Sequence, residues 1–205
     1  MFMEIEKKFS FTSQIHPLDG FLMIRENLGL RNGRFVENTD TYYDIGDSLA
    51  QKRMQIRKRN VAGKTEFTVK IPVLDGDITK RIEKNFDSLT DSLLFLKKEC
   101  GMENICLEEK VVLNTSRIVY DYLYQGGVFE VCFDQTVGIK EDKKYLPVYM
   151  VEIEYKEGKK DALYQLSQLL FQYPFIQECF FSKKEMVEKQ VEAGREMKLL
   201  RKKEK

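Results

Sequence analysis

The sequence predicts an α+β fold with a mainly antiparallel sheet or barrel. About eight segments show the two-residue period or the β-branched and aromatic residues typical of strands, and four show a helical period. The strand segments occur in groups and do not alternate strictly with helices, as they do in parallel α/β folds. No fixed-period repeat, low-complexity segment or linker divides the chain, so we expect residues 1–205 to form a single domain.

The expected strands end at Gly, Asp or Asn residues, which favour turns. They are residues 2–9, Arg34–Tyr43, Leu49–Arg59, Lys64–Ile71, Ile78–Phe86, Leu107–Tyr120, Tyr122–Asp134 and Val148–Tyr155. Within this set, Gln125-Gly126-Gly127 predicts a hairpin turn, because glycine accepts a positive φ.

Four segments carry helix signals. Leu18–Leu28 lies between Pro17 and Gly29, which are typical initiation and termination residues. In Leu89–Cys100 three leucines share one face, after a Ser88/Asp91 pair that resembles a capping box. The other expected helices are Asp161 to about Phe171 and Lys184 to about Leu200, the last followed by a basic tail, Arg201–Lys205, that we expect to be frayed.

Composition excludes several classes of protein. The 34 Lys and Arg residues against 33 Asp and Glu give a net charge of +1, which argues against binding nucleic acid through bulk charge but leaves a local anion site possible. A hydrophobic content of 42% is enough for a core. The charged start of the sequence and the lack of an apolar run of about 20 residues predict a cytoplasmic protein without a membrane span.

Cysteine and histidine offer little chemistry. The cysteines are scattered at positions 100, 106, 132 and 179, and His16 is the one histidine. This pattern supports neither a structural zinc site nor a Cys/His nucleophile pair, so we expect reduced, mostly buried thiols and a helix-entry role for His16. Any catalysis must therefore depend on carboxylates, lysines and arginines.

Charged residues of both signs share one side of the expected strands. Glu4, Glu6 and Lys8 alternate with apolar or other residues, and so do Glu152 and Glu154. Taken alone, this alternation fits an antiparallel sheet with one solvated face.

The order of the charged pairs is more specific, beginning with the ExExK pattern Glu4-Ile5-Glu6-Lys7-Lys8. Further matching segments are Asp40–Asp44, Gln55–Arg59, Phe67–Pro72, Arg81–Glu83, Arg117 with Tyr120, Val131–Asp134, Val151–Glu154 and Ser182-Lys183. Together they resemble the CYTH superfamily, named for class IV adenylyl cyclases and thiamine triphosphatase and also called triphosphate tunnel metalloenzymes. The resemblance spans about residues 2–185.

The resemblance implies an eight-stranded antiparallel β-barrel that forms a tunnel, with helices packed on the outside and charged side chains in the lumen. The substrate-binding residues that it implies are Lys8, Arg57, Arg59, Lys70, Arg81, Arg117 and Lys183. The implied ligands of Mg²⁺ or Mn²⁺ are Glu4, Glu6, Glu154, Glu152 and Asp134, the last two also being candidates for water activation. Glu83 is a further tunnel residue.

One position departs from the family pattern. Thr115 stands two residues before Arg117, where family members often carry a second basic residue, and Lys110 is a candidate to compensate. We expect the helix from Lys184 onward to pack against the barrel, with closure of one tunnel mouth as the alternative.

The resemblance favours a metal-dependent triphosphatase acting on inorganic, nucleoside or thiamine triphosphate. A class IV-type adenylyl cyclase and a non-catalytic polyphosphate-binding protein are the alternatives, and retention of the metal-type carboxylates argues against the latter. The expected partner is a small triphosphate-bearing molecule, and the sequence does not distinguish a monomer from a homodimer.

Overall fold

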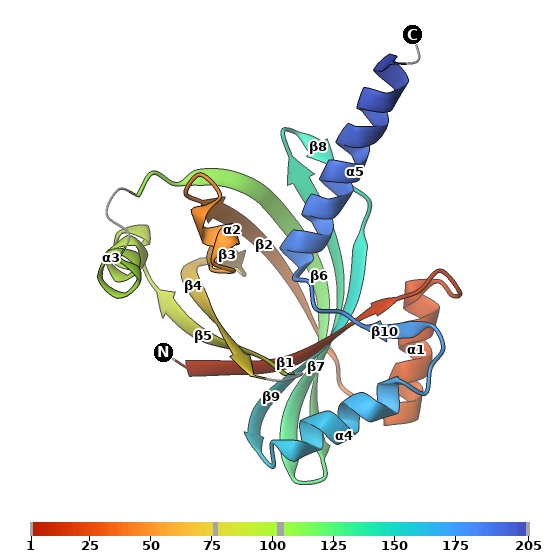
Figure 1. Cartoon of the computed structure of the whole chain (residues 1–205). Coiled ribbons are helices and arrows are strands. Elements are labelled where there is room, and N and C mark those ends of the chain that lie inside the picture. The colour runs from red at the N-terminus through yellow and green to blue at the C-terminus, as the bar shows by residue number, and fades with distance from the viewer. Residues whose placement is uncertain (1, 76–77, 102–104, 204–205) are drawn as a thin grey trace.

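The computed structural model describes residues 2–75, 78–101 and 105–203 and shows a β-barrel with helices around it (Figure 1). The strands within the described residues are β1 (Phe2–Phe11), β2 (Arg34–Asp44), β3 (Gln55–Val61), β4 (Lys64–Asp75), β5 (Ile78–Phe86), β6 (Glu108–Tyr124), β7 (Gly127–Lys140), β8 (Lys143–Lys144), β9 (Val148–Gly158) and β10 (Ile176–Glu178). The helices are α1 (Pro17–Leu28), α2 (Ser48–Gln51), α3 (Leu89–Cys100), α4 (Asp161–Leu170) and α5 (Lys183–Lys203).

Eight of the strands close into an antiparallel barrel, as expected. Their order around the barrel is β1-β5-β4-β3-β2-β6-β7-β9, and β9 completes the circle by pairing with β1. The short strands β8 and β10 extend the edges of β7 and β1. Closure pairs the edges of the eight strands with one another, so the lumen side of each strand is fixed by its register.

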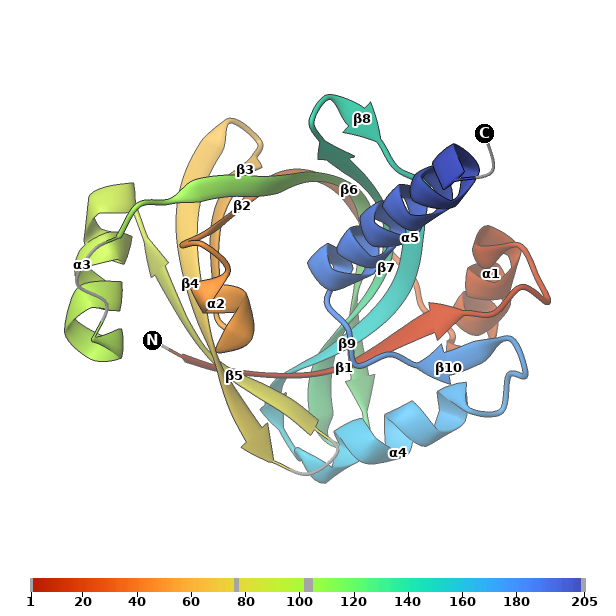
Figure 2. The same ribbon diagram turned by 45° about the horizontal axis from the view of Figure 1, so that its top comes forward.

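Helices α1, α2, α3 and α4 cover the outer face of the barrel (Figure 2). The outward side chains of β1, β7 and β9 pack with α1 and α4 in a core that includes Phe9, Phe21, Phe129, Ile153 and Leu163. On the other side, α3 and the short α2 cover β3 and β4 through Leu96, Leu49, Ile56 and Val69. These outward side chains are buried, so the helices cover an apolar outer face, and the charged side chains of the same strands point into the lumen.

The first turns of α5 lie on the lumen side of the barrel, unlike the other helices (Figure 2). Val187 belongs to an apolar cluster with Val111, Leu113 and Met150, whose positions alternate onto the lumen side of β6 and β9. A Cβ atom on Gly138 of β7 would lie 2.1 Å from Val187 Cγ1. The expected packing of this helix against the barrel is therefore confirmed, and the packing surface is the lumen side of β6, β7 and β9 at one end of the barrel.

Several local predictions are confirmed. His16 caps α1, where its Nδ1 accepts a hydrogen bond from the Leu18 amide, and Ser88 caps α3 by accepting from the Asp91 amide. The turn between β6 and β7 has φ of 47° at Gln125 and 81° at Gly126, as a type I′ hairpin requires. Among the cysteines, Cys106 is exposed and free, and Cys132 and Cys179 are buried and free.

Other boundaries differ from the prediction. The strand expected from Leu49 begins only at Gln55, because α2 occupies residues 48–51. Both oxygens of the buried Asp44 carboxylate accept amide hydrogen bonds there, from Ile45 and Leu49 on Oδ1 and from Ala50 on Oδ2. In the basic tail, α5 continues through Lys203, and residues 204–205 lie outside the described part of the chain.

Candidate functional site

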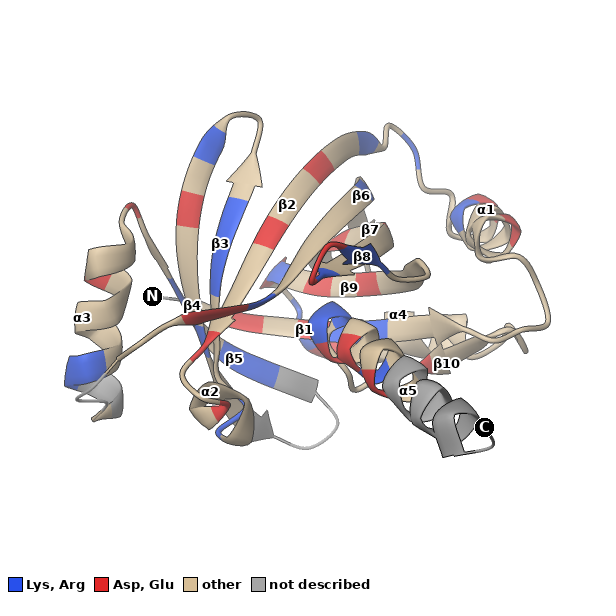
Figure 3. Cartoon of the chain, turned by 90° about the horizontal axis from the view of Figure 1, so that it is seen from above, with Lys and Arg blue, Asp and Glu red and all other residues tan. Residues whose placement is uncertain are grey.

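The lumen contains a cavity of about 270 Å³ whose walls are almost entirely charged. Its described lining residues are Glu4, Glu6, Lys8, Tyr42, Gln55, Arg57, Arg59, Lys70, Arg81, Glu83, Arg117, Glu130, Glu152, Glu154, Lys156, Ser182 and Lys183. Every predicted site residue except Asp134 is in this set. Figure 3 shows that both signs of charge recur along neighbouring strands, as the alternation in the sequence indicates.

Strand β3 contributes two arginines to the cavity, and β2 holds them with one aspartate. Arg59 donates two hydrogen bonds of 2.7 Å, from Nε and Nη2, to the carboxylate of Asp40, and Arg57 Nη1 lies 3.7 Å from the same carboxylate. Burial alone would raise the pKa of Asp40, but the charges of Arg57 and Arg59 hold it below its ordinary value. Asp40 therefore remains ionised and fixes the direction of both guanidinium groups.

Arg57 retains unused hydrogen-bonding capacity inside the lumen. Its Nε atom is buried and has no hydrogen-bond partner among the described residues. Although burial opposes the charged form, Asp40, Tyr42, Glu83 and Glu4 together raise the pKa of Arg57. A permanently charged, planar donor group in this position is suited to an anionic ligand with several oxygen atoms.

Lys70 joins two carboxylates from neighbouring strands of the barrel. Its Nζ atom lies 2.7 Å from Glu4 Oε1 and 2.7 Å from Glu83 Oε2. Burial raises the pKa of Glu83, but the charges of Lys70 and Arg57 outweigh it and bring the pKa below its ordinary value. The resulting network neutralises charges that would be costly to bury alone.

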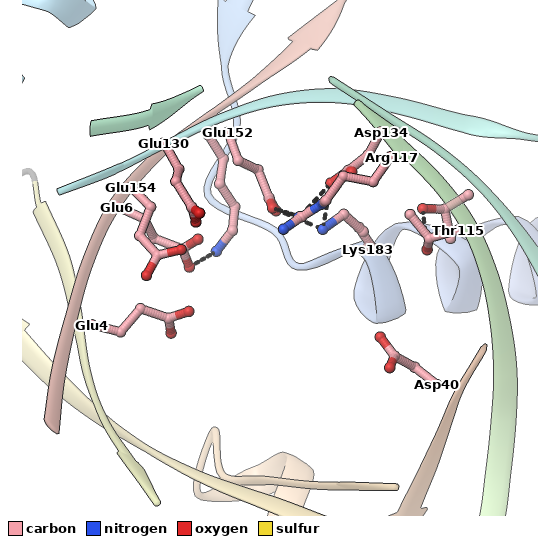
Figure 4. Close-up of polar contacts among 12 residues, drawn as sticks. Glu4, Glu6, Asp40, Thr115, Arg117, Glu130, Asp134, Glu152, Glu154 and Lys183 are labelled. Atoms are coloured by element: carbon pink, nitrogen blue, oxygen red, sulfur yellow. Dashed lines mark hydrogen bonds and ion pairs between the residues drawn. The ribbon is translucent and has the colours of Figure 1, made fainter. Parts of the chain in front are cut away.

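A second network joins β6, β7, β9 and α5 (Figure 4). Arg117 donates to both oxygens of Asp134, at 2.6 and 2.7 Å, and also to Glu152. Lys183 donates to Asp134 Oδ2 at 2.7 Å and to Glu152 Oε2 at 2.9 Å. Because Lys183 is the first residue of α5, the helix that packs on the lumen side also supplies a cation to the cavity wall.

Asp134 lies outside the cavity lining, unlike the other expected metal ligands. Its side chain is fully buried, does not line the cavity, and binds cations through both oxygens. Both oxygens of Asp134 therefore orient Arg117 and Lys183, which argues against the expected role of Asp134 in metal binding or water activation. Glu152 does line the cavity, but Lys183, Arg117 and Lys8 overcome the effect of burial and lower its pKa far below the ordinary value, which makes it a weak base.

Carboxylates from three adjacent strands form a row along one wall of the cavity (Figure 4). Glu6 of β1 is paired directly with Glu154 of β9, which is paired on its other side with Glu130 of β7. Like charges directly opposite each other destabilise a sheet. Burial raises the pKa of Glu154, and the charges of Glu4 and Glu6 add to this increase, whereas Lys156 opposes it.

The acidic row formed by Glu6, Glu154 and Glu130 has the type of ligand atoms that a divalent cation prefers. The donors of the row and of the nearby Glu4 are all carboxylate oxygens, which suit Mg²⁺ or Mn²⁺, and in this structure lysines balance their negative charge. Lys70 binds Glu4, Lys8 binds Glu6 and Lys156 binds Glu154. Within the described part of the chain, no three acidic, histidine or cysteine side chains already converge as a metal site, so a bound cation would have to draw the carboxylates away from these lysines.

The structure also accounts for the threonine that departs from the family pattern. The Thr115 hydroxyl is 2.9 Å from the hydroxyl of Thr136 on β7, and both side chains are buried. Lys110 does not compensate for the missing cation, because it binds Glu108 and Asp47 and does not line the cavity. That expectation was wrong, and Lys183 is the cation found near this end of the lumen.

Several lining residues were not among the predicted site residues. Glu130 had a sequence signal, because it shares the strand side of Asp134, and Lys156 completes a second ExExK pattern after Glu152 and Glu154. Asp40, which holds Arg57 and Arg59 without lining the cavity, lies in a segment that matches the family but was not assigned a role. Tyr42, Gln55 and Ser182 have no charge, so charge alternation could not identify them.

Comparisons with solved structures find the same fold in proteins of low sequence identity. A candidate adenylate cyclase of Bacillus halodurans has 19% identity and a TM-score of 0.60, with 91% of this chain and 98% of that chain covered. HpAC1 of Hippeastrum, a candidate adenylyl cyclase with a dominant triphosphatase activity, has 19% identity and a TM-score of 0.61, covering 91% and 95%. The PH1819 protein of Pyrococcus horikoshii OT3 has 20% identity and a TM-score of 0.58, covering 91% and 98%.

Sequence comparisons identify the family. A search of curated proteins gave no significant match. None of the helices in the described residues is long and apolar enough to cross a membrane. The sequence model of the CYTH domain matches residues 3–176, which include both ExE pairs and every predicted site residue except Lys183. The match covers most of the chain, and the closed barrel with its charged lumen agrees with it, so this chain belongs to the CYTH family.

Proposed function

We propose that this protein is a divalent-metal-dependent triphosphatase that hydrolyses inorganic triphosphate or a nucleoside or thiamine triphosphate inside the barrel. The observation that carries the proposal is that the complete cationic set and the row of carboxylates face one cavity. A triphosphate needs cations for its oxygen atoms, and the carboxylates would repel it unless divalent cations were bound between them.

The cations would hold the phosphate chain from several sides. Arg57 and Arg59 on β3 face the cavity from one wall, and Arg117 and Lys183 face it from β6 and α5. Asp40 and Asp134 orient these groups before the substrate binds, so little side-chain ordering remains to be done at binding. Lys8, Lys70 and Arg81 add charge at the cavity wall.

Glu4, Glu6 and Glu154 are the residues that we assign to Mg²⁺ or Mn²⁺. When bound, such a cation neutralises phosphate charge and lowers the pKa of coordinated water. The carboxylates would then leave Lys70, Lys8 and Lys156, and these lysines would become available to the phosphate oxygens. Phosphoryl transfer depends mostly on positioning and charge stabilisation, so the cavity needs no nucleophilic side chain.

The cavity favours recognition of the phosphate chain over recognition of an organic group. Tyr42 is the one aromatic side chain in its described lining, and no aliphatic side chain is present there. Stacking surfaces for a base or a thiazole ring are therefore scarce within the lumen. An adenylyl cyclase would use the same phosphate contacts, and the assay below distinguishes it through its products.

The test is to incubate the protein with Mg²⁺ or Mn²⁺ and, separately, with inorganic triphosphate, ATP and thiamine triphosphate, and to resolve the products. We expect release of orthophosphate from at least one of them and no turnover in EDTA. Formation of pyrophosphate and cyclic AMP from ATP would establish the cyclase alternative. Tight binding without any turnover would establish a binding protein.

Matched variants test the assignment of the residues. Glu4→Gln and Glu154→Gln should lower turnover by at least about 100-fold, because removal of one charge-stabilising group commonly costs that much. Glu157→Gln, at an exposed position on the same strand, should not. Arg57→Ala should weaken triphosphate binding, whereas Lys58→Ala, at the next position on β3, should leave it unchanged. Full activity in Glu154→Gln would refute the metal assignment.

A further inference from the structure

The ExExK pattern at the start of the chain is repeated on the neighbouring strand. Glu152, Glu154 and Lys156 on β9 have the same spacing as the triad on β1, and the two strands are antiparallel with Glu6 opposite Glu154. Lys156 is also the extra residue of a β-bulge, because Phe129 of β7 pairs with Tyr155 whereas Val128 pairs with Glu157. Bulges often redirect a side chain next to a functional site.

The position of Lys156 marks the open end of the cavity. Side-chain exposure increases along the lumen side of β9, from 9% at Glu152 to 23% at Glu154 and 37% at Lys156. At the opposite end of the strand, Met150 and Val148 are buried in the cluster that includes α5. A ligand that enters the lumen therefore passes Lys156 before it reaches Arg117 and Lys183.

Lys156 binds two carboxylates of the acidic row. Its Nζ atom is 2.7 Å from Glu130 Oε2 and 2.8 Å from Glu154 Oε1. Each of these carboxylates has another cation available. Arg34 Nη2 lies 3.2 Å from the other oxygen of Glu130, and Glu154 is one of the proposed metal ligands. Lys156 could therefore leave both partners without abandoning an unpaired charge.

We propose that Lys156 is a substrate-binding residue at the cavity entrance, which exchanges Glu130 and Glu154 for the outermost phosphate of a bound triphosphate. The inference rests on the proposed function and extends it to a residue beyond the predicted set. The lysine ammonium is a compact charge on a flexible four-carbon stem, so it can move between partners without any backbone change. Glu130 holds this charge at the entrance while the cavity is empty.

A purely structural salt bridge makes a different prediction. Partly exposed ion pairs contribute little to stability, and both Lys156→Met and Glu130→Gln would break the pair in the same way. If Lys156 instead binds phosphate, the two substitutions act in opposite directions. Loss of the lysine removes a ligand contact, whereas loss of the Glu130 charge frees the lysine and removes a repulsive group from the entrance.

The experiment uses calorimetry with Mg²⁺ present to measure binding of diimidotriphosphate and imidodiphosphate, the analogues of triphosphate and pyrophosphate whose bridging nitrogen atoms resist hydrolysis. It also measures KM for triphosphate with Mg²⁺. We expect Lys156→Met to weaken triphosphate binding by about tenfold, as the loss of one charged hydrogen bond implies. Pyrophosphate is shorter and bound by the deeper cations, so its affinity should change much less. Glu130→Gln should tighten triphosphate binding, and Lys156→Arg, which keeps the charge, should bind more tightly than Lys156→Met.

Lys144→Met is the control, because Lys144 is an exposed lysine on β8 outside the cavity. Equal triphosphate affinity in Lys156→Met and the wild type would overturn the inference, as would weaker binding in Glu130→Gln. If the wild type binds triphosphate but hydrolyses none of the substrates, the proposed function fails while the binding data still test Lys156. If the wild type neither binds nor hydrolyses triphosphate, both proposals fail.

Discussion

The contact between Gly138 and Val187 can be tested by adding a single methyl group. Gly138 lies on the lumen side of β7, and its ideal Cβ position is 2.1 Å from Val187 Cγ1 and 3.0 Å from Val187 Cγ2. A Gly138→Ala substitution must therefore displace α5 or the barrel wall. Val187→Ala removes both methyl groups that the new Cβ would meet, although the Val187 Cβ atom remains at 3.1 Å.

The expected free energies follow from this geometry. Overpacking a tight core position costs about 1–3 kcal/mol, and the 2.1 Å approach places Gly138→Ala near the upper end of that range. Val187→Ala removes two fully buried methyl groups and should cost about 2 kcal/mol. In the double variant the clash is largely absent, so its cost should fall short of the sum of the single costs by about 2 kcal/mol.

The wild type, the two single variants and the double variant form a double-mutant cycle, and urea unfolding monitored by circular dichroism gives the free energy of unfolding of each. Gly33→Ala combined with Val187→Ala is the control, because the Gly33 Cβ would meet the Tyr120 ring instead, and these effects should add. Gly138→Ala should also raise KM for triphosphate, since α5 carries Lys183, and the double variant should recover part of that loss. Additivity within about 0.5 kcal/mol would show that Val187 does not cover Gly138.

Further predictions concern buried charges and thiols. Asp40→Asn should cost about 3–5 kcal/mol at neutral pH, because two arginines lose their shared partner. The pKa of Asp40 is lowered in the folded state, so its contribution to the free energy of unfolding is complete above its ordinary pKa of 3.8. That contribution disappears as the pH falls through the pKa that Asp40 has in the folded protein, and urea unfolding at a series of pH values between 7 and 3 would reveal the loss. Asp134→Asn should weaken triphosphate binding measured by calorimetry, because it loosens Arg117, whereas binding of Mn²⁺ should change little. At pH 8, a maleimide should label Cys106 in the native protein and spare Cys132, whose pKa burial raises to about 12, as peptide mapping can show.

The sequence determined the fold through signals that depend on neighbouring residues. The two-residue period of β1 places Glu4, Glu6 and Lys8 on one side whatever the strand pairs with, and the same holds for Glu152 and Glu154. The boundaries of β5 and α3 were confirmed because turn and capping residues mark them locally. Alternation together with the family resemblance therefore predicted almost every charged residue to which a phosphate or metal role is assigned.

Only the tertiary structure decided which charges meet and where the cavity closes. Asp134 shares the alternation of a metal ligand, but Arg117 and Lys183 come from distant segments and occupy both of its oxygens. The lumen position of α5 depends on Gly138, since only a residue without Cβ admits Val187 there. Alternation assigns a side chain to one face of a strand. The partners and the exposure of that side chain depend on how the eight barrel strands and α5 are arranged around the lumen.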